Sequence, residues 1–157
     1  MFRGLILTSS VDWTVKLWSL THSPEPIVEM VTPSYDYVCC VEWSPANSPL
    51  FATITSGGSV NIWNLSKSVI DPVDTLVINK FSNSTVSSSV SSKQPQSVAT
   101  LNKFAWMKDG RKLVVGDSSG VIHVVSVNES VATARPGDES KFESFLFSHK
   151  GTPFTIQ

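Results

Sequence analysis

The sequence predicts an all-β fold. Strand-forming residues are abundant, polar turn residues separate them, and a strand–turn–strand pattern returns along the chain. Of the 157 residues, 41% are hydrophobic and 10% aromatic, and serine and valine are the two commonest types. Valine and the aromatic residues favour strands, whereas serine is frequent in turns. A chain of this length has room for one ordinary domain with one core.

Net charge, the lengths of the apolar runs and the cysteines restrict the partners and the compartment that we expect. Twelve Lys and Arg residues against thirteen Asp and Glu residues leave a net charge of −1. We expect no nucleic-acid partner, because phosphate binding needs a positive field. The chain has no apolar run near the roughly 18 residues of a membrane span and no signal peptide, so we expect no membrane association. The adjacent Cys39 and Cys40 would point to opposite faces of a strand, which excludes a disulfide and fits the reducing cytoplasm.

The strand–turn–strand pattern occurs three times. Trp18 closes the first copy and Trp63 the second, whereas Val125 stands at this position in the third. Each copy has two β-rich runs around a short polar turn, which is the signature of a hairpin. The paired runs are residues 5–9 with 14–18, residues 50–54 with 59–63, and residues 112–116 with 121–125.

Further strands extend each hairpin. A strand ending in an aromatic residue precedes the second and third copies, and a weaker β segment follows every copy as a predicted outer strand. The complete unit therefore has four strands, and 45 residues separate Trp18 from Trp63. That period matches the roughly 40 to 45 residues of one propeller blade. The preceding strands are 37–43 and 101–106, and the outer segments are 27–30, 75–78 and 130–133.

We therefore expect a partial β-propeller of about two and a half four-stranded blades over residues 1–134. The first blade lacks its inner strand. Residues 82–97 hold eight serines and no apolar face, so we expect a disordered insertion between two blades. A closed ring needs about four or more blades, so the chain is expected to be a fragment of a longer protein, as a truncated gene model or a short isoform. The predicted blades are 1–30, 35–80 and 100–134.

The C-terminal tail, residues 135–157, contains a helical pattern. Asp138 and Glu139 come first, and apolar residues follow at 142, 145 and 146 after a Pro-Gly pair. This spacing predicts a short amphipathic helix. Two interpretations stay open at this point: the helix packs under the propeller, or it docks on a partner.

The sequence gives no sign of catalysis. His22, His123 and His149 are scattered over a turn, a strand and the tail. His123 alternates with apolar neighbours, so we expect a strand-face histidine with a local partner. Zinc-ligand spacing, a nucleophile elbow and a phosphate loop are all missing from the sequence. We expect no enzyme activity, no catalytic residue, no metal, no cofactor and no small-molecule substrate.

Residues 10–18, Ser-Val-Asp-Trp-Thr-Val-Lys-Leu-Trp, closely resemble the diagnostic stretch of WD repeats. In that family, an aspartate in the turn and a closing tryptophan join a buried hydrogen-bond network. The resemblance implies that Asp12, Trp18 and Trp63 are structural positions, with Asp12 holding the turn because a buried carboxylate needs surrounding donors.

The later copies depart from this pattern. Gly57 and Ser119 stand where the family has its aspartate, so we expect divergent blades with a degenerate network. The exposed turn residue Trp13 is the aromatic side chain most suited to meet a partner, with packing against a neighbouring blade as the alternative.

The order of the segments as a whole resembles the C-terminal portion of cytoplasmic dynein intermediate chains. This resemblance implies a non-catalytic subunit of a motor complex, in the cytoplasm and on the cytoskeleton, whose propeller binds the dynein heavy chain. It also implies other dynein subunits as partners, only indirect contact with microtubules, and a role in microtubule-based retrograde transport. The matching segments are 9–18, 36–45, 49–52, 61–65, 101–103, 115–118 and 135–139.

Alternative hypotheses remain open. One is an intermediate chain of a ciliary or axonemal dynein, which would share the fold and differ in compartment. Another is a WD-repeat scaffold of an unrelated complex, such as a ubiquitin ligase. A third is a fragment without function that the cell degrades.

Overall fold

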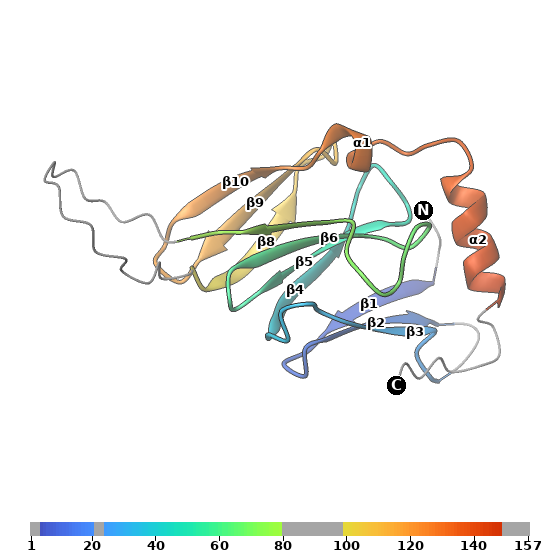
Figure 1. The fold of residues 1–157 in the computed structure, drawn as a ribbon, viewed down its shortest axis with the longest axis horizontal. Coiled ribbons are helices and arrows are strands. Elements are labelled where there is room, and N and C mark those ends of the chain that lie inside the picture. Colours follow the sequence, from blue (N-terminus) through green and yellow to red (C-terminus); the bar gives the residue numbers. More distant parts are fainter. Residues whose placement is uncertain (1–3, 21–23, 80–98, 149–157) are drawn as a thin grey trace, which may run out of the picture.

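The computed structural model describes residues 4–20, 24–79 and 99–148. Within these ranges the chain forms ten strands in three antiparallel sheets, followed by two helices. The sheets lie next to one another as successive blades (Figure 1). The all-β prediction with a short helical tail is confirmed. The predicted insertion at 82–97 and the residues His22 and His149 lie outside the described residues.

The first sheet has three strands, in the order β1-β2-β3. Leu7 pairs with Leu17 across the β1–β2 hairpin, which fixes the register that the repeat predicts. Among the described residues, no strand pairs with the inner side of β1, as the sequence indicated for the first blade. The strands are β1 (Leu5–Ser9), β2 (Thr14–Ser19) and β3 (Val28–Val31).

The second sheet is a complete four-stranded blade in the order β4-β5-β6-β7. Every residue of β5 and β6 is buried. A register shift between Val38 and Cys40 bends the inner strand, and the two free cysteines lie on opposite sides, Cys39 exposed and Cys40 buried. The strands are β4 (Val38–Trp43), β5 (Leu50–Thr55), β6 (Ser59–Asn64) and β7 (Asp74–Val77).

The third sheet runs β8-β9-β10 and lacks the outer strand that we predicted at residues 130–133. That prediction was wrong, because residues 129–132 form the short helix α1 (Glu129–Ala132). The side chain of Asn128 accepts a hydrogen bond from the Ser130 amide, at 3.0 Å, and so caps the helix start. Ala132 is a strong helix former and is buried in the core. The strands are β8 (Leu101–Trp106), β9 (Lys112–Asp117) and β10 (Ile122–Ser126).

The middle blade is covered on both faces. Along β5, Ile54 faces a core cluster shared with the third sheet, whereas Phe51 faces a second cluster shared with the first sheet. The two-residue period of a strand divides its side chains between the two clusters. The hydrophobic core therefore lies between neighbouring blades, as a propeller requires.

The tail forms helix α2 (Asp138–Ser148), as the apolar spacing predicted. Phe142 is fully buried, and Phe145 and Leu146 pack with it against the cluster between the first two sheets. The Phe142 and Trp43 ring centroids lie 6.4 Å apart. Of the two interpretations left open, the structure shows the helix packed on the blades, beside their strand ends (Figure 1).

Candidate functional site

The two tryptophans predicted as structural positions occupy equivalent places in neighbouring sheets. Trp18 Nε1 donates to Thr8 Oγ1 at 2.8 Å, and Trp63 Nε1 donates to Thr53 Oγ1 at 3.2 Å. Phe51 stacks on Trp63 with parallel rings 5.8 Å apart. Trp63 is wholly buried, whereas Trp18 is only partly buried. Each of these two blades therefore fastens its central hairpin with the same tryptophan-to-threonine bond.

Asp12 holds its turn, but from an exposed position. One carboxylate oxygen accepts hydrogen bonds from the Thr14 amide at 3.1 Å and the Thr14 hydroxyl at 2.7 Å. The hydroxyl bond is the main reason why the pKa of Asp12 lies below its ordinary value. The expectation of a buried carboxylate was wrong, because Asp12 is exposed to solvent. Trp18 makes its bond to Thr8 instead, so Asp12 and Trp18 belong to separate hydrogen-bond sets.

In the second blade, Asp36 supplies the carboxylate that Gly57 lacks. Asp36 lies in the loop before β4, and its Oδ1 accepts from the Ser56 hydroxyl at 2.7 Å and the Tyr37 amide at 2.8 Å. A Cβ atom on Gly57 would collide with the Asp36 carboxylate. Glycine at 57 leaves the space that the carboxylate of Asp36, upstream in the chain, fills, while Trp63 bonds Thr53 separately.

Replacing Gly57 by alanine is expected to lower the free energy of unfolding by about 1–2 kcal/mol, because the new methyl group displaces the carboxylate from Ser56. Urea denaturation followed by circular dichroism measures the loss. Gly116→Ala is the matched control, since its Cβ would meet only the Lys103 carbonyl at an ordinary 3.9 Å. Equal midpoints for the two variants would contradict the role assigned to Asp36.

Asp117 plays the corresponding part in the third blade. Its carboxylate accepts from the amides of Ser119 at 2.8 Å and Val121 at 3.0 Å, and lies 2.9 Å from His123 Nε2. Both side chains of the His123–Asp117 pair are largely buried. The hydrogen bond from His123 is the first cause that holds the pKa of Asp117 below its ordinary value. His123 thus has the local partner that its strand position predicted.

This pair predicts acid sensitivity of the third blade. An aspartate with a lowered folded-state pKa adds stability above its unfolded pKa of about 3.9 and loses it as pH falls through the folded value. Asp117→Asn is expected to melt at a lower temperature than the parent at pH 7, and the gap should close below about pH 4. Asp71→Asn, at an exposed position, is the control. A gap that stays constant with pH would exclude the assigned role.

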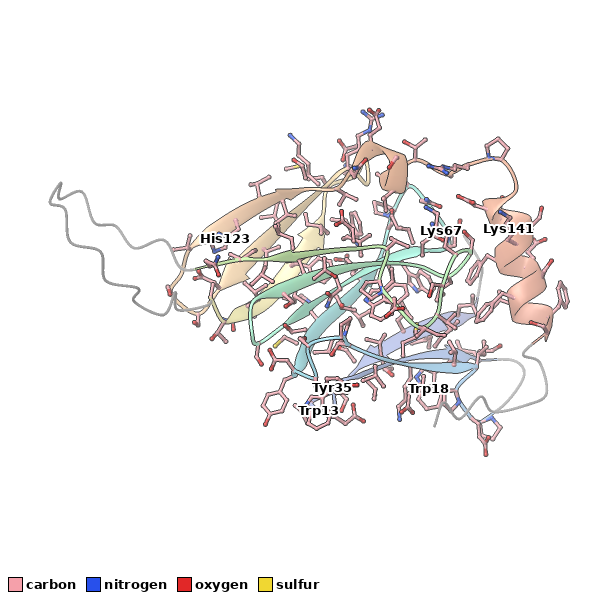
Figure 2. The ribbon with its side chains drawn as sticks, in the orientation of Figure 1. Trp13, Trp18, Tyr35, Lys67, His123 and Lys141 are labelled. Atoms are coloured by element: carbon pink, nitrogen blue, oxygen red, sulfur yellow. The ribbon has the colours of Figure 1, made fainter. Side chains whose placement is uncertain are left out.

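The turns of neighbouring blades join into one continuous surface, which we call the loop face: residues 10–13, 32–37 and 55–58. Backbone bonds connect its parts. The Val38 amide donates to the Ser10 carbonyl at 3.1 Å. The Thr32 amide donates to the Trp13 carbonyl at 3.0 Å, and the Ser56 amide donates to the Tyr37 carbonyl at 2.9 Å. Figure 2 shows Trp13 and Tyr35 side by side on this face, with ring centroids 6.0 Å apart.

The described part of the chain holds no cluster of three or more His, Cys, Asp or Glu side chains able to bind a metal ion. Neither helix of the described ranges has the length and apolar character that crossing a membrane needs.

The sequence analysis missed Asp36, Ser56 and Asp117. The main local signal that could have found one of these residues was the alternation of side chains from Asp117 to His123 along the third hairpin.

Three neighbouring antiparallel sheets, with a repeated tryptophan-to-threonine bond, define a class of protein: a partial WD-repeat β-propeller. The structure is similar to the WD40 domain of coronin from Toxoplasma gondii, with a TM-score of 0.61 and 20% sequence identity. The match covers 80% of this chain and 28% of the coronin chain. At this identity the likeness shows the fold alone.

The sequence is similar to that of one particular protein. The chain is 32% identical over 145 residues to the cytoplasmic dynein 1 intermediate chain of Drosophila melanogaster. The match covers 92% of this chain and 19% of that protein, so the chain spans about a fifth of this relative's length. No family model matches the chain. The resemblance to cytoplasmic dynein intermediate chains is confirmed.

Proposed function

We propose that the chain is part of a non-catalytic intermediate-chain subunit of cytoplasmic dynein, and that its propeller binds the dynein heavy chain. The observation that carries this proposal is the 32% identity extending over 92% of the chain. Other dynein subunits are then partners as well, and microtubules are reached only through the heavy chain. The complex works in the cytoplasm on the microtubule cytoskeleton and supports retrograde transport.

The use of the polar groups supports a non-catalytic role. The carboxylates of Asp12, Asp36 and Asp117 each accept hydrogen bonds from their own turn or a neighbouring loop. Such groups stabilise the loops, and the loops form a surface on which another protein can bind. ATP hydrolysis belongs, on this proposal, to the heavy chain.

Titration of the purified chain with a purified tail fragment of a cytoplasmic dynein heavy chain tests the proposal. We expect saturable binding that needs no nucleotide, together with no ATP hydrolysis by the chain itself. The matching tail fragment of an axonemal heavy chain is the control, and tighter binding to it would favour the ciliary or axonemal alternative. Absence of binding to both tails would contradict the proposal and favour a WD-repeat scaffold of another complex.

A further inference from the structure

Four large side chains are exposed together on the loop face, and we call them the aromatic patch: Val11, Trp13, Tyr35 and Tyr37. Their exposed fractions are 69%, 43%, 67% and 54%. The bond from the Val38 amide to the Ser10 carbonyl brings the two ends of the patch together. Clustered apolar and aromatic surface of this kind is the usual mark of a protein-binding site.

The backbone holds the two central rings outward in a strained conformation. Trp13 has φ 71° and Tyr35 has φ 47°, the left-handed region that bulky side chains seldom adopt. The fully buried Thr32 fixes both, because its amide donates to the Trp13 carbonyl and its carbonyl accepts from the Tyr35 amide. Glycine or asparagine would relieve the strain at either position. An observed outlier that presents an exposed ring indicates a functional constraint.

The charge around the patch is negative. Asp12 precedes Trp13 directly and Asp36 follows Tyr35 directly. The nearby cation, Lys16, is already paired with Glu29 at 3.0 Å. The ring planes of Trp13 and Tyr35 meet at 84°, so the rings form a corner, and an aspartate adjoins each ring residue in the sequence. Electron-rich ring faces and carboxylates both attract a cation, and a planar guanidinium can stack on a ring while it hydrogen-bonds a carboxylate.

From this arrangement we propose that the aromatic patch binds a protein segment that presents an arginine side chain to Trp13 and Tyr35. The proposal rests on the proposed function as an assembly subunit, and it names the chemistry of one surface through which the propeller meets another protein. Asp12 and Asp36 neutralise the guanidinium, and Val11 and Tyr37 contact the apolar neighbours of that arginine.

The test uses peptides as the probe. Two immobilised libraries of nine-residue peptides are compared, one with arginine fixed at the centre and one with citrulline, which has the same shape without the charge. We expect the 157-residue chain to bind the arginine library at least about fivefold more strongly. The double variant Trp13→Gly with Tyr35→Gly should lose this preference while its melting temperature stays within a few degrees of the parent, because glycine adopts both φ angles freely.

Two further variants make the result specific. Asp12→Asn keeps an oxygen for the Thr14 bonds and removes the charge, so it should weaken the arginine preference without loss of structure. Ile70→Ala, at an exposed position away from the loop face, should leave the preference unchanged. No preference for arginine in the parent chain, or an equal preference in the folded double variant, would overturn the proposal.

Heavy-chain binding is measured on the same samples, which separates the two proposals. If the parent binds the heavy-chain tail and shows no arginine preference, the patch proposal fails and the proposed function stands. If the arginine preference is present and depends on Trp13 and Tyr35 while tail binding is absent, the patch proposal stands and the assignment to dynein fails.

Discussion

Trp63→Ala is expected to lower the free energy of unfolding by about 3–5 kcal/mol, which is a large share of the roughly 5–15 kcal/mol that holds an ordinary domain. Trp63 has no exposed surface and stacks on Phe51 in the cluster between the first two sheets. The substitution leaves a large cavity there and removes the donor that Thr53 accepts from. Chemical denaturation of the variant, followed by circular dichroism, measures the loss.

Trp18→Ala is the matched control for this prediction. Trp18 makes the same bond, to Thr8, at the same ten-residue separation, but it is only partly buried. We expect a loss of about 1–2 kcal/mol for it, because less apolar surface returns to water. Equal losses for the two variants would show that the hydrogen bond matters more than burial, contrary to this prediction.

Phe142→Ala is expected to cost a similar amount, about 3–5 kcal/mol, and to release helix α2 from the blades. Phe142 is fully buried, and its ring lies 6.4 Å from Trp43 and 6.3 Å from Phe145. A helix of eleven residues is marginal by itself in water. Without this anchor, α2 should therefore lose most of its helicity as well as its contact with the sheets.

Limited proteolysis with mass spectrometry measures the release. Cleavage within residues 138–148 should become much faster in Phe142→Ala than in the parent chain, since cleavage follows the population of the open form. Phe147→Ala is the control, because that side chain is 65% exposed. Protection that is the same in Phe142→Ala and the parent would show that α2 stays in place for another reason.

Local pattern was sufficient to predict most of the fold. The three hairpins follow from runs of β-branched and aromatic residues around polar turns, and α2 follows from the spacing of residues 142, 145 and 146. The prediction of an outer strand at 130–133 was wrong for an equally local reason. Asn128 caps a helix start, and the strand prediction gave weight to Val131 and overlooked that cap.

The hydrogen-bond sets at the turns were harder to predict, because they depend on contacts between distant segments. Asp36 reaches Ser56 across twenty residues, and only the fold brings the loop before β4 beside the β5–β6 turn. Burial is also set by the fold. The sequence around Asp12 resembles the WD-repeat stretch in which the aspartate is buried, and yet Asp12 is exposed. The aromatic character of Trp13 was visible in the sequence, whereas its approach to Tyr35 was not.

The proposed function predicts that this protein travels with the dynein motor complex in the cell. Immunoprecipitation from native extract tests this most directly, with an antibody raised against residues 135–157 and mass spectrometry of everything captured. We expect a dynein heavy chain and light chains in the precipitate, removed by competition with the immunising peptide. Capture of the protein without any dynein heavy chain would contradict the proposed function.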